Sequence, residues 1–259
     1  MAEYVLETKG LGISFGGLHA AQDVNIRIKK NQIYGLIGPN GAGKTTIFNL
    51  LTCVYKPTAG TFYLDGEEMK GLTPEKINQK GIARTFQNIR LFNNMTVVRN
   101  VMVGLHNRPE FKCSLLDSVL RLPRHRKIEK EMREKAKELL RLFDLEEERN
   151  SLACNLPYGK QRKLEIARAL ATNPKILLLD EPAAGMNPQE TQELGEFIVK
   201  IREKYDLTIL MIEHHMDLVM QFSDHIYVID FGKQIAHGEP AEIKANPRVI
   251  EAYLGVTEE

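Results

Sequence analysis

A glycine-rich segment between an apolar run and a helix-forming run constrains this chain more than any other feature. The segment fits the phosphate-binding pattern G-x-x-x-x-G-K-[ST] and consists of Gly38, Pro39, Asn40, Gly41, Ala42, Gly43, Lys44, Thr45 and Thr46. The preceding run Ile33–Ile37 is typical of a strand, and the following run Ile47–Leu51 of a helix. Glycines in such a loop turn successive backbone N–H groups toward one point, where the helix start adds its positive dipole end. The segment therefore predicts a nucleoside triphosphate site.

Two side chains of this loop have chemistry suited to a triphosphate. Lys44 can reach the β- and γ-phosphates, and the Thr45 hydroxyl can hold Mg²⁺. The alternative is a glycine-rich turn that binds no ligand. The strand before the loop and the helix after it favour a nucleoside triphosphate with Mg²⁺ over that alternative.

The composition indicates the cellular compartment of the protein and bears on which kinds of partner it binds. The chain has 259 residues with a formal net charge of +1, so its composition gives no argument for nucleic acid as a partner. No run reaches the roughly 18 apolar residues of a membrane span, and the first ten residues lack the layout of a secretory signal. The three cysteines, Cys53, Cys113 and Cys154, form no C-x-x-C pair and indicate free thiols in a reducing compartment. We therefore expect a cytoplasmic protein.

The order of apolar segments predicts an α/β fold with an inserted helical part. Apolar residues recur at three- and four-residue spacing from Lys127 to Phe143, which predicts an amphipathic helix. The continuous apolar run Ile176–Leu179 predicts a strand that is buried on both faces, and Thr208–Ile212 predicts another buried strand. The expected strands are Tyr4–Glu7, Val24–Ile28, Ile33–Ile37, Phe62–Leu64, Ile82–Phe86, Ile176–Leu179, Thr208–Ile212, Ile226–Ile229 and Gln234–His237.

Two acidic residues follow the apolar run Ile176–Leu179. Chemistry in a parallel sheet gathers at the carboxyl ends of the strands, so Asp180 is placed to hold Mg²⁺ beside the Thr45 hydroxyl. Glu181 is placed to orient the attacking water or to accept its proton. The alternative is that both residues only begin a turn before Pro182.

The segment before the acidic strand resembles the signature of the ATP-binding subunits of ABC transporters, L-S-G-G-Q followed by a helix that ends in I-A-R-A-L. Leu156, Gly159 and the run Ile166–Leu170 match this pattern, whereas Pro157 replaces the serine and Tyr158 the first glycine. In the family this segment binds the γ-phosphate of the ATP held by a second subunit. The resemblance implies such a contact in trans for Leu156, Gly159, Lys160 and Gln161, with backbone N–H groups near the helix start taking the place of the missing hydroxyl.

Further residues match family motifs in the family's order. Gln87 resembles the glutamine that senses Mg²⁺ and water, and His214 the histidine that contacts the γ-phosphate. Phe15 resembles the aromatic residue that stacks on adenine, and Asn187 stands where the family's dimer-interface loop usually has Asp. The resemblance thus implies Glu181, His214 and Gln87 as catalytic residues, and Thr45, Gln87 and Asp180 as metal-site residues.

The resemblance covers the whole chain and is close to the branched-chain amino-acid importer ATPases. Its specific features include Arg84–Phe92 and the terminal Ala252–Gly255. It implies an ABC-type P-loop NTPase fold: a RecA-like ATP-binding core with an antiparallel β subdomain, plus an inserted α-helical subdomain. We expect the core at 1–87 and 161–259, and the helical subdomain at 88–160.

The resemblance also implies a function and partners. We expect an ATPase that powers uptake of branched-chain amino acids from the cytoplasmic face of the membrane, as a peripheral subunit. Its expected partners are membrane permease subunits, a second ATPase subunit (a sister chain or a second copy), and indirectly a solute-binding protein. The alternatives are a transporter ATPase for another solute, such as urea, an amide or lipopolysaccharide, a soluble non-transport ABC ATPase, and a non-catalytic scaffold built on the fold.

Overall fold

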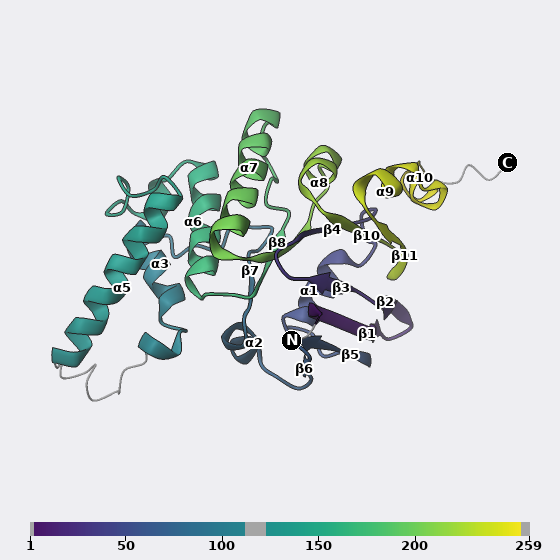
Figure 1. The fold of residues 1–259 in the computed structure, drawn as a ribbon, viewed down its shortest axis with the longest axis horizontal. Helices are drawn as coiled ribbons and strands as arrows, with labels where there is room; N and C mark the ends of the chain where they lie inside the picture. Colours follow the sequence, from purple (N-terminus) through teal and green to yellow (C-terminus); the bar gives the residue numbers. More distant parts are fainter. Residues whose placement is uncertain (1–2, 112–122, 255–259) are drawn as a thin grey trace. The chain divides into compact units, whose positions relative to one another are not determined.

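Two compact units make up the chain. The computed structural model describes residues 3–111 and 123–254 (Figure 1). One unit joins residues 1–87 to 175–259, and the other is the helical unit 88–174. The expected boundary at 160 differs from the division at 174. The reason is helix α6 (Tyr158–Ala171), which packs against helix α3 (Val97–Leu105) inside the helical unit.

A six-stranded sheet is the centre of the first unit. Its strand order is β11-β10-β4-β9-β8-β7, and all neighbouring strands are parallel except β10 and β11. Every residue of β4, β8 and β9 is buried, which explains their continuous apolar sequences. The strands are β4 (Ile33–Ile37), β7 (Ile82–Arg84), β8 (Ile176–Asp180), β9 (Thr208–Ile212), β10 (His225–Asp230) and β11 (Lys233–Gly238).

A second, antiparallel sheet belongs to the same unit. Its path is β2-β1-β5-β6, and β3 pairs with β1. The strands are β1 (Tyr4–Phe15), β2 (Leu18–Val24), β3 (Arg27–Lys29), β5 (Ala59–Leu64) and β6 (Glu67–Glu68). Two sequence expectations differ from this sheet. The first strand continues beyond Glu7 to Phe15, and Val24–Ile28 is not one strand, because β2 ends at Val24 and β3 begins at Arg27.

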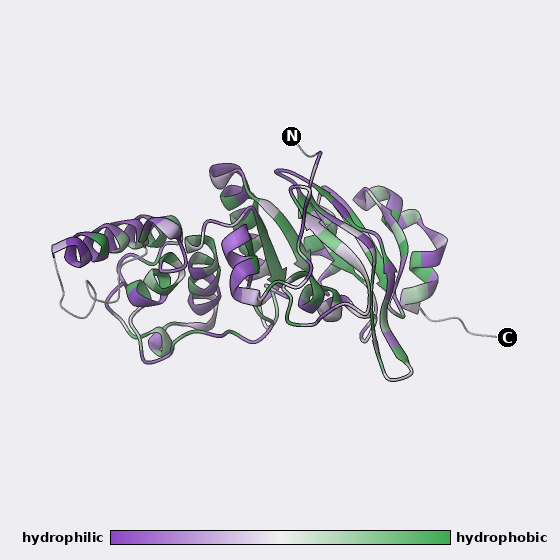
Figure 2. Cartoon of the chain, turned by 90° about the horizontal axis from the view of Figure 1, so that it is seen from below, coloured by the Kyte–Doolittle hydropathy of each residue, from purple (hydrophilic) through white to green (hydrophobic). Residues whose placement is uncertain are grey.

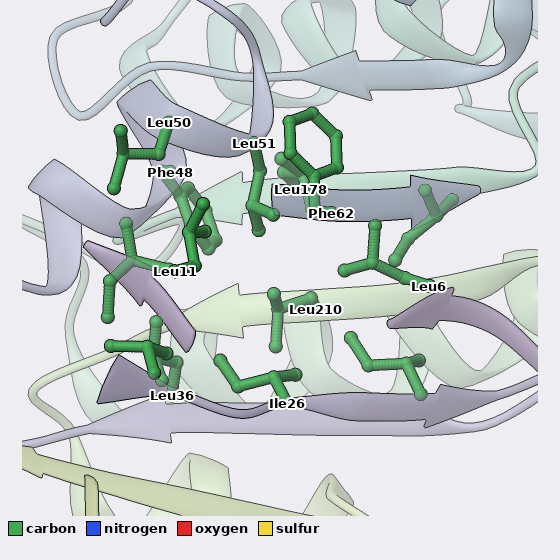
Figure 3. Close-up of a cluster of buried hydrophobic side chains, with 14 of the residues drawn as sticks. Leu6, Leu11, Ile26, Leu36, Phe48, Leu50, Leu51, Phe62, Leu178 and Leu210 are labelled. Carbon is green, nitrogen blue, oxygen red and sulfur yellow. The ribbon is translucent and has the colours of Figure 1, made fainter. Parts of the chain in front are cut away.

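The main core lies between helix α1 (Lys44–Leu51) and residues of both sheets. Figure 3 shows side chains of α1, such as Phe48 and Leu51, beside Leu6 and Phe62 of the antiparallel sheet and Leu178 and Leu210 of the six-stranded sheet. Fully burying a side chain of this size stabilises the fold by roughly 1.5–3 kcal/mol. This core fixes the orientation of α1 and therefore the position of the loop that precedes it.

Other helices cover the opposite face of the six-stranded sheet. Helices α7 (Pro188–Tyr205) and α8 (Met216–Phe222) lie on the side away from α1 (Figure 1). A Cβ atom at Gly35 would come within 2.6 Å of Val219 Cγ1, so glycine allows α8 to approach β4 closely. The remaining helices of this unit are α2 (Pro74–Lys80), α9 (Pro240–Ala245) and α10 (Pro247–Leu254).

In the described part of the helical unit, 88–111 and 123–174, the α-helices are α3, α5 (Pro123–Leu142) and α6. The expected amphipathic helix exists as α5, which starts four residues before Lys127 and buries Met132, Ala136 and Leu140. The exposed side of α5 is hydrophilic in Figure 2. A Cβ atom at Gly104 would lie 2.3 Å from the Arg168 carbonyl, so a glycine in α3 lets it contact α6 closely. Two short 3-10 helices are η1 (Pro109–Phe111) and η2 (Ala153–Asn155).

The structure tests two expectations from composition, which concern membrane spans and free cysteines. Within 3–111 and 123–254, no helix has the length and apolar character needed to cross a bilayer. Cys53 and Cys154 are free thiols, and Cys113 and the 112–122 segment lie outside the described residues.

Candidate nucleotide site

Strand register brings the predicted residues of the first unit to one edge of the six-stranded sheet. Leu36 of β4 and Asp180 of β8 are both paired with Ile212 of β9. The glycine-rich loop, Glu181 and Glu213 therefore leave the sheet at the same level. This is the carboxyl edge of the parallel strands, where ligands bind in open α/β sheets.

The glycine-rich loop has a backbone that only glycine fits at two positions. Gly38 has a φ of 154° and Gly43 a φ of 101°, and Gly43 is the N-cap of α1. A Cβ atom would lie 1.9 Å from the Ile229 carbonyl oxygen at Gly38, and 2.4 Å from that of Ala20 at Gly43. Packing against β10 and β2 thus holds the loop in this shape.

Lys44 is buried inside the loop. Its ammonium group donates to the carbonyl oxygens of Gly38 at 2.7 Å and of Pro39 at 2.8 Å. Burial lowers the pKa of Lys44, and the nearby negative charges of Glu181 and Asp180 partly oppose that change. A buried ammonium with two acceptors is well placed to receive a strongly anionic ligand.

The loop, Glu181 and His214 enclose a small hollow of about 230 Å³. Its floor is the start of α1, where the first backbone N–H groups of a helix have no intrahelical acceptor. Successive N–H groups of a glycine-rich loop at a helix start bind phosphate oxygens. The lining residues are Asn40, Gly41, Ala42, Gly43, Lys44, Thr45, Thr46, Glu181 and His214.

Asp180 is buried and forms an ion pair that the sequence did not predict. Its Oδ2 atom lies 2.6 Å from Nη2 of Arg84 at the end of β7, and the two side chains are 3% and 6% exposed. Its other oxygen, Oδ1, is buried and has no hydrogen-bond partner among the described residues. A buried, unpartnered carboxylate oxygen at this edge fits a Mg²⁺ site, because Mg²⁺ takes oxygen ligands.

Glu181 is held between two side chains that the sequence had assigned to the same site. Gln87 Nε2 donates to Glu181 Oε2 at 2.7 Å, and His214 Nε2 lies 2.8 Å from Glu181 Oε1. Glu181 also has a left-handed backbone φ of 47°, a conformation that costs a residue other than glycine roughly 1–3 kcal/mol. Side chains from two other segments therefore fix the Glu181 carboxylate beside the hollow.

Sequence reasoning missed Glu213, which ties the neighbouring loops together. Its buried carboxylate accepts hydrogen bonds from the N–H groups of Ala183 at 2.7 Å and His214 at 3.0 Å. The same carboxylate lies 3.2 Å from Nδ1 of His215. Glu213 therefore holds the backbone that positions Glu181 and His214. Its position directly after the buried strand β9 was the only sequence signal.

Phe15 lies at the end of β1 and is 47% exposed. Its ring makes an edge-to-face contact with Tyr55 at a centroid distance of 5.4 Å. An exposed aromatic face of this kind can stack on a planar base. Tyr55, which sequence reasoning missed, would support it.

The residues expected to act in trans belong to the helical unit. Helix α6 begins at Tyr158, and Pro157 is its N-cap without a side-chain cap. The Leu156 side chain is buried, its carbonyl accepts a hydrogen bond from Gln161 Nε2 at 2.9 Å, and Lys160 pairs with Glu148. These side chains thus make their contacts within the helical unit. The first N–H groups of α6, including that of Gly159, are what this segment offers a ligand.

A second buried ion pair lies in α6 itself. Arg162 Nη1 is 2.8 Å from Glu165 Oε2, and the side chains are 0% and 1% exposed. Glu165 Oε1 accepts the backbone N–H of Arg90 at 3.1 Å. Glu165 Oε2 is thus used inside α6, and Oε1 connects α6 with the segment that follows Gln87 in sequence.

Comparison with known proteins identifies the family. The family model described as ABC transporter matches residues 21–184, and that described as branched-chain amino acid ATP-binding cassette transporter matches 233–259. The high-affinity branched-chain amino acid transport ATP-binding protein BraF of Pseudomonas aeruginosa is 49% identical over 98% of this chain and 99% of its own length. The chain belongs to the ABC transporter family of ATP-binding proteins.

Solved structures agree with this assignment. A nucleotide-free ATP-binding cassette from an ABC transporter superposes with a TM-score of 0.84 at 34% identity, over 98% of this chain and all of that one. A dimeric bacterial ABC transporter cassette has a TM-score of 0.75 at 25% identity, over 91% of this chain and 98% of that one. The predicted fold class is confirmed.

Proposed function

We propose that this chain is the ATP-hydrolysing subunit of an importer for branched-chain amino acids. The observation that carries the enzymatic part is the meeting of Lys44, Asp180 and Glu181 at one edge of the sheet, with Gln87 and His214 on the Glu181 carboxylate. The similarity to BraF over nearly the whole chain supports the choice of solute class.

The phosphate loop and the metal-site residues would hold the triphosphate. Lys44 would exchange its two backbone acceptors for phosphate oxygens, and the N–H groups at the start of α1 would bind the rest of the phosphate chain. Thr45, Gln87 and Asp180 would hold Mg²⁺, which when bound neutralises phosphate charge and orients the γ-phosphate. Phe15 would stack on the adenine ring.

Glu181 would act on the attacking water. Gln87 and His214 fix both oxygens of its carboxylate, so the carboxylate has a defined orientation toward the hollow. A carboxylate in this position orients the water and accepts its proton as the bond to the γ-phosphate forms. His214 would in addition contact the γ-phosphate.

A second ATPase subunit would complete the site, and we favour a sister chain over a second copy. The N–H groups at the start of α6, near Gly159 and Lys160, would face the γ-phosphate held by that subunit, with Leu156 and Gln161 shaping the segment. Binding of ATP would then close the pair, and loss of the γ-phosphate would release it. The solved dimeric ABC transporter cassette supports the pairing of two ATPase subunits.

The remaining partners follow from the importer assignment. Closure would move membrane permease subunits docked near Gln87–Met95 and the helical unit, and a solute-binding protein would act indirectly through them. The chain would then sit at the cytoplasmic face of the membrane as a peripheral subunit.

A reconstituted transporter tests this proposal. The chain, coexpressed with its permease subunits and solute-binding protein, should show ATP hydrolysis stimulated by leucine, isoleucine or valine, and should move labelled leucine into proteoliposomes. Stimulation by urea, an amide or lipopolysaccharide instead would identify a transporter ATPase for another solute. Absence of ATP hydrolysis by the complete complex would refute the enzymatic assignment.

A further inference from the structure

Arg84 occupies a position at the nucleotide site that the function above does not use. It stands at the end of β7, and its guanidinium contacts three different segments. Nη2 lies 2.6 Å from Asp180 Oδ2, and Nη1 donates to Asn49 Oδ1 of α1 at 2.7 Å. The guanidinium also lies over the ring of Phe48 at 5.4 Å and of Phe86 at 5.1 Å. Arg84 is therefore fixed by polar and aromatic contacts together.

The contact with Arg84 gives the two oxygens of the Asp180 carboxylate different surroundings. Oδ2 is held by Arg84, and Oδ1 is buried without a partner in the part of the chain that the structure describes. The carboxylate can therefore present only Oδ1 to a cation. A fixed arginine also excludes rotation of the carboxylate, because the pair is almost completely buried.

The charges at the carboxyl edge of the six-stranded sheet argue against binding of a metal ion when no nucleotide is present. Lys44 and Arg84 face Asp180 and Glu181, so two cations balance two carboxylates. Glu181 is in addition bonded to Gln87 and His214. Across residues 3–111 and 123–254, no group of three or more His, Cys, Asp or Glu side chains could hold a metal. The triphosphate would have to bring both the missing charge and the missing oxygen ligands.

We propose that Arg84 is a positioning residue that keeps Asp180 from binding a divalent cation until nucleotide arrives, and that aims Oδ1 at the metal once it does. This inference rests on the proposed nucleotide site. Its consequence is an order of events: the metal enters with the triphosphate rather than before it.

The test measures metal binding without nucleotide. Full-length, chelator-treated protein is titrated with Mn²⁺, and free Mn²⁺ is followed by its electron paramagnetic resonance signal. Arg84→Met removes the charge but keeps an unbranched, polarizable side chain between the two rings. We expect this variant to bind Mn²⁺ at least about tenfold more tightly than the wild type, because one cation is lost beside a buried carboxylate. Adding Asp180→Asn should abolish the gain.

Arg162→Met is the matched control, because it breaks the other buried ion pair, in the helical unit. It should leave Mn²⁺ binding at the wild-type level. Equal Mn²⁺ affinity in Arg84→Met and wild type would overturn the proposal, as would a gain of the same size in Arg162→Met.

A second measurement needs no Arg84 variant and applies even if Arg84→Met does not fold. In the wild-type background, Asp180→Asn should leave Mn²⁺ binding unchanged without nucleotide and weaken it when ATP is present. Nucleotide-free wild type that binds Mn²⁺ tightly through Asp180 contradicts the proposed role of Arg84. Failure of the wild type to bind ATP is a separate outcome, measured without Mn²⁺, and counts against the proposed function.

Discussion

Two buried arginine–carboxylate pairs among the described residues, Arg84–Asp180 and Arg162–Glu165, have similar N–O distances but differ in how fully their carboxylates are hydrogen-bonded. Arg162 and Glu165 are three residues apart in one helix, and both oxygens of the carboxylate have partners. Arg84 and Asp180 are 96 residues apart, join two strands, and leave one carboxylate oxygen without a partner. Burial of an ion pair therefore does not separate structural from functional groups. At the edge of the sheet where the other site residues gather, the unpartnered Oδ1 of Asp180 indicates a position for a cation, whereas Glu165 has no free oxygen to offer one.

The largest expected difference between the two regions is in the rate of ATP hydrolysis. Replacing Glu181 with Gln removes the proton acceptor but keeps the hydrogen-bonding shape, so kcat should fall by about 10²- to 10⁴-fold while ATP affinity is kept. Glu165→Gln, the matched change in the helical unit, should alter kcat by only a few-fold. Steady-state hydrolysis and equilibrium ATP binding measure the two effects. A near-normal rate in Glu181→Gln would remove Glu181 from its assigned role.

Breaking the helical pair should give the largest loss of stability. Arg162→Met leaves the Glu165 charge buried without its partner and should lower the free energy of unfolding by about 3–5 kcal/mol. Chemical denaturation followed by circular dichroism measures this loss. Arg141→Met, in an exposed pair with Glu146, is the control and should leave the free energy of unfolding nearly unchanged, because solvent screens exposed ion pairs. A loss of similar size in both variants would mean that burial of the pair is not what matters.

Nucleotide affinity should depend on one lysine of the first unit. Lys44→Ala removes the buried ammonium at the phosphate loop, and loss of a charge-assisted hydrogen bond weakens binding by about 1.5–3 kcal/mol, or roughly ten- to a hundredfold. Isothermal titration with ATP measures the affinity. Lys160→Ala, which breaks the Lys160–Glu148 pair of the helical unit, should not change ATP binding by the isolated chain. Unchanged affinity in Lys44→Ala would count against the phosphate loop.

The smallest expected effect concerns how the helices of the two units begin. Asn187 caps α7 by accepting the N–H of Glu190 at 2.9 Å, whereas Pro157 gives α6 no side-chain cap. Asn187→Ala should therefore cost about 1 kcal/mol of stability by thermal denaturation. Gln189→Ala, at an exposed position of the same helix, should change it by less than about 0.5 kcal/mol. If the two variants are equally stable, the cap contributes nothing.

Local patterns predicted the parts of the site that lie within one short segment. The glycine-rich loop, the buried strands β4 and β9 and the acidic residues after β8 follow from composition and spacing over a few residues. The family resemblance added Gln87 and His214, and the structure brings both onto Glu181. The contacts of Gln87 and His214 with Glu181 depend on the register between strands, and a single sequence does not specify that register.

Long-range contacts explain what the sequence did not predict. The partner of Asp180 stands on another strand, so neither residue identifies the other in sequence. The Leu18–Val24 strand is mostly exposed and has no apolar run or alternation that predicts a strand, and it forms because β1 pairs with it. Asn187, which was placed at a dimer interface by resemblance, uses its side-chain oxygen to cap α7. Each case depends on tertiary contact and not on local propensity.

The exposed pair of Phe15 and Tyr55 offers a position for a fluorescent reporter of nucleotide binding. The sequence contains no tryptophan, so intrinsic emission comes from tyrosine. Phe15→Trp would introduce the sole indole at the position proposed for adenine, 5.4 Å from a tyrosine ring in the present structure. Its fluorescence would report nucleotide arrival without a chemical label, and would separate base stacking from phosphate binding in time.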